Sequence, residues 1–112
     1  MNYKLFLDDI RNPKTEGPWV IVRSFKEAVN EIIKRGKFPN YISFDHDLEH
    51  NHDKNEEYKT GYDFARWLVK QDMNGTFLFD NNFKFNVHSA NPIGKKNIEF
   101  YLNSYLNLKY KL

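Results

Sequence analysis

Three short apolar segments, each followed at once by polar side chains, restrict the fold of this chain more than any other feature. Runs this short and this apolar are typical of strands buried in a parallel sheet. Helical patterns separate them, so the order of elements predicts an α/β fold with a central, mostly parallel sheet. The segments are residues 3–7 before Asp8-Asp9, residues 41–44 before Asp45-His46-Asp47, and residues 83–87 before His88-Ser89.

A fourth apolar run, residues 19–23, has the density of β-branched side chains that is typical of a strand. Only a Pro- and Gly-containing link, residues 12–18, separates it from the first acidic pair. Because this link is too short for an ordinary crossover helix, we expect the helix between the first two strands to be shortened or absent. The later order of strand, helix and strand implies a right-handed parallel crossover.

Three helices are predicted from their capping residues and their apolar periodicity. Asn before Pro is a typical helix start, because Pro lacks the N–H that the first turn leaves unpaired. The helices are expected from the capping box Ser24/Glu27 to Gly36, from Thr60 to Asn74-Gly75, and from Asn91-Pro92 onward.

Three other segments are less defined. Residues 76–79 and 83–87 form either a small hairpin or one strand preceded by an insertion. Residues 49–59 are polar and aperiodic, which is typical of a solvated loop. Residues 108–112 either add a short strand or fray.

Length and composition exclude several classes of protein. A chain of 112 residues with 40% hydrophobic and 17% aromatic residues predicts one globular domain, residues 1–112. A net charge of +2 does not favour non-specific binding to nucleic acid or membranes. The absence of Cys excludes disulfides and thiol catalysis. No apolar run approaches the roughly 18 residues of a membrane span, and we see no signal-peptide pattern, so we expect a cytoplasmic protein. Its oligomeric state is left open.

Carboxylates gather where the predicted strands end. In open parallel sheets, ligands bind beyond the carboxyl ends of the strands, so Asp8, Asp9 and Asp45 are expected to meet there. Carboxylates held close together repel unless a cation, a shared proton or hydrogen-bond donors compensate them. Mg²⁺ (or Mn²⁺) bound by these three residues is one solution, since hard cations prefer oxygen ligands. The alternative is that each Asp caps a turn.

Two histidines follow predicted strands, and imidazole is the side chain whose ordinary pKa lies nearest to neutral pH. His46 and His88 are therefore candidates for acid and base, with Asp47 orienting either His46 or a ligand-bearing water. The alternative for either ring is packing with its nitrogens hydrogen-bonded. His50 and His52 lie in the polar loop, where their i, i+2 spacing is a weak signal for a metal or catalytic site.

The start of the last helix predicts an anion site. Its free backbone N–H groups point back toward the strand ends, where Ser89 and Asn91 also lie. Gly94 permits close approach of a ligand, and Lys95 and Lys96 place cations where the helix dipole disfavours them. A bound phosphate would offset that cost. The alternative is that both lysines point into solvent.

These residues together resemble, in order and across nearly the whole chain, the cyclic-phosphate-processing receiver-like domains, relatives of response-regulator receiver domains. The resemblance implies a flavodoxin-like α/β sandwich. It also implies Mg²⁺ binding by Asp8 and Asp9, the phosphoacceptor position at Asp45, and the receiver Ser/Thr position at Ser89. The matching motifs are Leu5-Phe6-Leu7-Asp8-Asp9-Ile10-Arg11, Phe44-Asp45-His46-Asp47-Leu48, Thr60-Gly61-Tyr62-Asp63 and Val87-His88-Ser89-Ala90-Asn91-Pro92.

Two departures from receivers bear on function: the short first link, and the lack of a recognisable fifth strand with its lysine. Histidines at positions 46 and 88 favour hydrolysis over signalling. The leading hypothesis is a metal-assisted phosphoesterase for cyclic phosphates of nucleotides or RNA ends, with Asp45, Asp47 and the two histidines as catalytic residues. A nucleotide or cyclic-dinucleotide binding module and a phosphoacceptor receiver are the alternatives.

Overall fold

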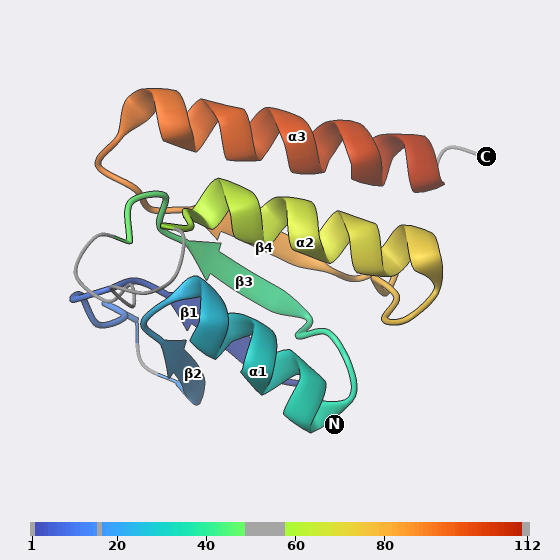
Figure 1. Cartoon of the computed structure of the whole chain (residues 1–112), viewed down its shortest axis with the longest axis horizontal. Coiled ribbons are helices and arrows are strands. Elements are labelled where there is room, and N and C mark those ends of the chain that lie inside the picture. Colours follow the sequence, from blue (N-terminus) through green and yellow to red (C-terminus); the bar gives the residue numbers. More distant parts are fainter. Residues whose placement is uncertain (1, 16, 49–57, 111–112) are drawn as a thin grey trace.

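Two strands come first and helices and strands then alternate in the computed structural model, which describes residues 2–15, 17–48 and 58–110 (Figure 1). The predicted α/β fold is confirmed. The elements are β1 (Lys4–Leu7), β2 (Trp19–Val22), α1 (Phe25–Arg35), β3 (Tyr41–Phe44), α2 (Gly61–Asn74), β4 (Lys84–Val87) and α3 (Pro92–Tyr110).

The four strands form one parallel sheet in the order β2-β1-β3-β4. Leu7 pairs with both Val22 and Phe44, and Phe44 pairs in turn with Val87. All four strands therefore end at the same level. Whatever follows β1, β3 and β4 must emerge side by side at this edge of the sheet.

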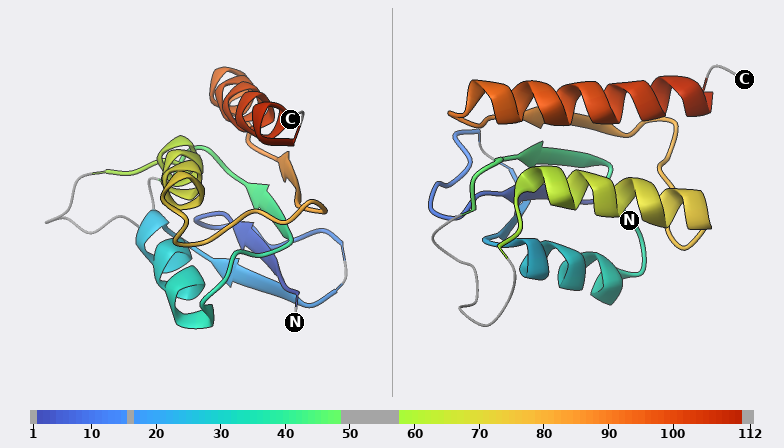
Figure 2. Two further views of the ribbon diagram at one scale, coloured as in Figure 1. Left: turned by 90° about the vertical axis from the view of Figure 1, so that its right-hand side faces the viewer. Right: turned by 45° about the horizontal axis from the view of Figure 1, so that its top comes forward.

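The two faces of the sheet are covered differently. Leu5, Leu7, Ile42 and Phe44 alternate along β1 and β3 and are fully buried at 0% exposure. They face α1 and α2, while α3 packs against α2 and along β4 (Figure 2). Among the described residues, no helix lies between β1 and β2, as predicted, and none covers the opposite face of the sheet.

Residues 76–83 form no strand in the structure, so β4 is a single strand preceded by an insertion. The Phe79 ring fills the core instead, with its centroid 4.8 Å from that of Phe38. The Phe79 N–H donates to Asp72 Oδ1 at 2.8 Å, which satisfies the backbone without a partner strand. The segment before β4 thus buries an aromatic ring in the core and does not form the first strand of a hairpin.

The helix caps agree with the sequence except in one detail. Ser24 Oγ accepts from the Glu27 N–H at 3.1 Å, but the Glu27 carboxylate accepts from the Arg23 N–H rather than from Ser24. The prediction of a full capping box at α1 is therefore wrong, because the second hydrogen bond, from the Ser24 N–H to Glu27, is not formed. At α2, by contrast, Thr60 and Asp63 form both hydrogen bonds of a capping box.

Helix α3 continues to Tyr110, so no short strand forms over residues 108–110. Residues 111–112 and 49–57, which include His50 and His52, lie outside the described part of the chain. No helix in the described residues combines the length and the apolar character needed to cross a membrane.

Candidate functional site

The ends of β1, β3 and β4 bring Asp8, Asp45 and His88 together. Each residue extends the parallel ladder one step beyond its strand: the Asp45 N–H donates to the Leu7 carbonyl, and the His88 N–H donates to the Phe44 carbonyl, both at 2.9 Å. One potential ligand atom from each side chain lies within 4.8 Å of the other two. The predicted convergence of these three strand ends therefore occurs.

Asp8 is fully buried and surrounded by donors. Its Oδ1 accepts from the backbone N–H groups of Ile10 and Arg11, at 3.0 and 2.8 Å. Its Oδ2 accepts from Arg11 Nε at 3.0 Å and lies 2.9 Å from His88 Nε2. Burial alone would raise the pKa of Asp8, but these hydrogen bonds outweigh it and hold the pKa below its usual value. Asp8 is therefore a stable carboxylate.

Asp45 has the opposite electrostatic behaviour. Burial raises its pKa, and the nearby charge of Asp8 raises it further, against the opposing effects of Arg11 and His88. Asp45 Oδ1 accepts from the His46 N–H at 2.9 Å and lies 3.6 Å from the Arg11 guanidinium. The two carboxyl groups thus have pKa values shifted in opposite directions, a pattern often found where proteins do acid–base chemistry.

Both ring nitrogens of His88 are engaged. Nε2 lies 2.9 Å from Asp8 Oδ2, and Nδ1 lies 2.7 Å from Ser43 Oγ. The ring stacks on Phe6 with centroids 4.5 Å apart and planes within 4°. These contacts fix the orientation of His88, which suits a ligand or a positioning role more than free proton transfer.

His46 and Asp47 form a second pair at the same edge. His46 Nδ1 lies 2.8 Å from Asp47 Oδ1, and Asp47 also accepts two longer hydrogen bonds, of 3.4 Å each, from the Asn91 amide. A carboxylate on Nδ1 selects the tautomer that carries its proton there and leaves Nε2 as the basic atom. The pair thus has the arrangement of a general acid–base.

Two glycines allow neighbouring segments to pack closely at this edge of the sheet. The Gly61 N–H donates to the His46 carbonyl at 2.8 Å, and a Cβ at position 61 would lie 1.8 Å from the Asp45 carbonyl oxygen. A Cβ at Gly94 would lie 2.4 Å from His46 Cγ. Gly94 therefore makes room for the His46 ring, rather than for a ligand as the sequence indicated.

The N-terminus of α3 is largely satisfied by its own cap. Asn91 Oδ1 accepts from the Gly94 N–H at 2.9 Å, and the Lys95 N–H donates to the Asn91 carbonyl. Pro92 has no N–H, so the first turn offers an incoming anion the Ile93 N–H. This confirms Asn91 as the cap and leaves fewer donors for phosphate than the sequence suggested.

The other predicted site residues lie around this cluster. Asp9 is buried, but the described group of potential metal ligands contains His88 and not Asp9. Ser89 Oγ accepts from the Asn91 N–H at 3.1 Å. Lys95 and Lys96 are exposed on the first turn of α3.

Sequence reasoning missed Arg11, Ser43 and Phe6 as parts of the site. Ser43 had a readable signal: it is the single polar residue in an apolar strand, two positions before Asp45 and so on the same face. Arg11 and Phe6 lie within the first motif of the family resemblance, but the reach of a guanidinium and the stacking of two rings depend on the folded geometry.

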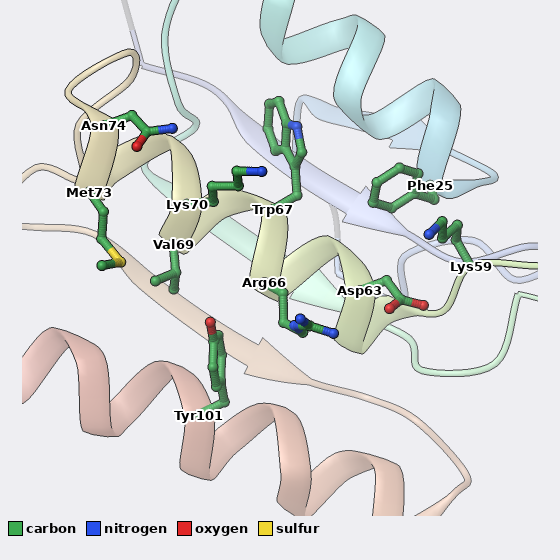
Figure 3. Close-up of a pocket in the computed structure, with 10 residues that line it drawn as sticks. All are labelled: Phe25, Lys59, Asp63, Arg66, Trp67, Val69, Lys70, Met73, Asn74 and Tyr101. Atoms are coloured by element: carbon green, nitrogen blue, oxygen red, sulfur yellow. The ribbon is translucent and has the colours of Figure 1, made fainter.

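Two hollows lie on opposite sides of the sheet, and they differ in their position relative to the site. One, of about 300 Å³, adjoins the site on the helix-free face and is lined in part by Arg11, Ser43 and His88. The other, of about 390 Å³, lies on the helical side and contains none of the predicted site residues (Figure 3). The first is therefore the hollow relevant to the chemistry.

A comparison with known families finds a match over most of the chain. The model of the cyclic-phosphate processing receiver domain matches residues 3–104, which include all of β1 to β4 and every residue of the site described above. Neither the curated proteins nor the solved structures contain a match to the chain.

Proposed function

The chain belongs to the family of cyclic-phosphate processing receiver domains, and on this basis we propose that it is a metal-assisted phosphoesterase that opens cyclic phosphates of nucleotides or RNA ends. The observation that carries the proposal is the convergence of Asp8, Asp45 and His88 within 4.8 Å, beside the His46–Asp47 pair. Cation binding and proton transfer would then take place at one edge of the sheet.

Asp8, Asp45 and His88 fit a divalent cation. Two carboxylates suit Mg²⁺ or Mn²⁺, and the imidazole nitrogen shifts the preference toward Mn²⁺. Ser43 on Nδ1 supplies the outer hydrogen bond that ligand histidines usually have. A bound cation would neutralise charge on the phosphoryl oxygens. Arg11 now contacts both carboxylates, and its side chain is 47% exposed, so it has room to turn toward a phosphate.

The proposed reaction adds water to phosphorus and breaks the bond from phosphorus to one ribose oxygen, which takes up a proton. His46, with Nδ1 held by Asp47, accepts at Nε2 the proton that the attacking water loses and returns it to the departing ribose oxygen. Arg11 holds the phosphoryl oxygens, and Ser89 and the Ile93 N–H at the start of α3 add donors. Lys95 and Lys96 supply long-range attraction for the anion.

The test is hydrolysis of 2′,3′-cyclic nucleotides and of RNA ending in a cyclic phosphate, with Mg²⁺, with Mn²⁺ and with EDTA. We expect turnover that needs the cation and falls about 100-fold or more in His46→Ala. Lys34→Ala, on the exposed side of α1, is the control.

Three outcomes would overturn the proposal. Stoichiometric binding with recovery of intact ligand would indicate a binding module. Labelling by acetyl phosphate that disappears in Asp45→Asn would indicate a phosphoacceptor. If the protein neither hydrolyses nor binds any cyclic phosphate, the site is not that of a phosphoesterase.

A further inference from the structure

The helix-free face of the sheet carries aromatic side chains where a solvated face would carry polar ones. Phe6 is only 7% exposed although no described helix covers it. Its ring meets the edge of Trp19 at 5.7 Å, and Trp19 meets Tyr41 at 5.8 Å. Because this face lacks a helical layer, Trp19 and Tyr41 stay half-buried, and the three rings line a hollow rather than a second core.

The hollow of about 300 Å³ lies on this face, between the sheet and the segment that follows β1. Arg11 and His88 belong both to its lining and to the strand-end site, so the hollow and the site are continuous. At its other end lie Tyr41 and Asn86, joined by a hydrogen bond of 2.8 Å from the Tyr41 hydroxyl to Asn86 Oδ1. That bond leaves the Asn86 NH₂ group as a donor at the exposed end.

We propose that this hollow holds one nucleoside of the substrate, with the base against Trp19 and Tyr41, near Asn86, and the cyclic phosphate toward Arg11 and His88. The inference rests on the proposed function and adds the place where the base of the substrate binds. A base offers a flat aromatic surface and a hydrogen-bonding edge, and aromatic rings bind it with little sequence preference. A hollow of this size is at the lower limit of small-molecule pockets, which fits one nucleoside and not an oligonucleotide.

Charge favours a nucleotide over a second copy of this chain. Lys4 and Lys84 are exposed on β1 and β4, and Lys14 and Arg11 line the hollow. Two copies meeting through this face would bring like charges together, whereas stable protein interfaces have few charged residues in their centre. A nucleotide phosphate would instead be attracted.

The first experiment uses the two tryptophans. Trp67 lies on the helical side, so Trp67→Phe leaves Trp19 as the reporter. In EDTA, we expect 2′,3′-cyclic nucleotides to quench Trp19 fluorescence, and ribose 2,3-cyclic phosphate, which lacks a base, to leave it unchanged. Equal responses to the two ligands would overturn the inference, as would no response to either.

The second experiment separates this inference from the proposed function. With Mn²⁺ present, Trp19→Ala and Asn86→Ala should raise KM for cyclic nucleotides, by about 10-fold for Trp19→Ala, and leave kcat nearly unchanged. The KM for the base-free substrate should not move. Asn82→Ala, an exposed asparagine outside the hollow, is the matched control. RNA with a terminal cyclic phosphate, compared with the mononucleotide, shows which source of nucleoside is preferred.

Each negative result has a separate meaning. Hydrolysis with equal KM values in all variants would overturn the nucleoside hollow and leave the phosphoesterase intact. Base-dependent quenching without hydrolysis of any substrate would overturn the phosphoesterase and leave the hollow. A dimer in sedimentation experiments that Asn86→Ala dissociates would assign this face to a second copy.

Discussion

Two regions of the molecule bury aspartates, and they differ in what surrounds the carboxylates. Asp72, 6% exposed on α2, accepts hydrogen bonds from Lys109, Tyr105 and the Phe79 N–H. Burial would raise its pKa, but these partners lower it. At the strand ends, Asp8 has comparable partners, yet Asp45 lies beside it with a raised pKa.

We interpret the difference as that between a structural carboxylate and one that belongs to the proposed site. Every oxygen of Asp72 has a fixed partner, and its hydrogen bonds link α2 to α3 and to the segment before β4. The strand-end pair holds two acids with one guanidinium between them, so a second cation or a proton would still improve its energy. Burial of an acid alone therefore does not support a site, whereas incomplete compensation of its charge supports the proposed one.

The largest effect should come from Asp45→Asn. We expect cyclic-phosphate hydrolysis to fall about 100-fold or more, because a cation ligand and a negative charge are lost. The free energy of unfolding should stay the same or rise, because the repulsion with Asp8 disappears. Steady-state kinetics and urea denaturation measure both. A variant that is destabilised and fully active would show that Asp45 is structural.

Asp72→Asn should behave in the opposite way. The ion pair with Lys109 is lost while an amide can still accept from the Phe79 N–H, so we expect a loss of about 2 kcal/mol in unfolding free energy. Activity per folded molecule should be unchanged below the melting transition. A large fall in kcat without destabilisation would contradict the comparison.

Ser43→Ala tests the site through one hydrogen bond. Loss of the hydrogen bond to His88 Nδ1 should lower the affinity of the site for the divalent cation by about 10-fold, which is typical when the hydrogen-bond partner of a ligand histidine is removed. The Mn²⁺ concentration for half-maximal activity measures this, with Ser104→Ala, exposed on α3, as the control. Equal Mn²⁺ dependence in both variants would separate Ser43 from the cation site.

The sequence predicted the fold and much of the site because both follow from strand ends. The apolar runs before Asp8, Asp45 and His88 imply parallel strands, and parallel strands in register must end together. The short link before Trp19 likewise implied the missing helix. Such features are local, since each depends on a few consecutive residues.

The rest depends on contacts between distant segments. Lys109 is 37 residues from Asp72, and no pattern in the sequence shows how α3 lies on α2. The sequence indicated Gly94 as a place for phosphate, whereas the structure places the His46 ring against it at the start of α3. Side-chain partners of this kind are decided by the tertiary arrangement.

The smallest expected effect is on the acid dependence of stability. Because the folded pKa of Asp72 is lowered, its stabilisation is complete above the unfolded value near 3.8 and is lost as pH falls through the folded pKa. The raised pKa of Asp45 acts in reverse: its contribution is present at low pH and is lost as pH rises through the folded value. Urea denaturation between about pH 2 and 6 should therefore show a flatter acid limb in Asp72→Asn and a steeper one in Asp45→Asn than in the unmodified chain. Parallel curves for the two variants would mean that the two regions bury their carboxylates in equivalent environments.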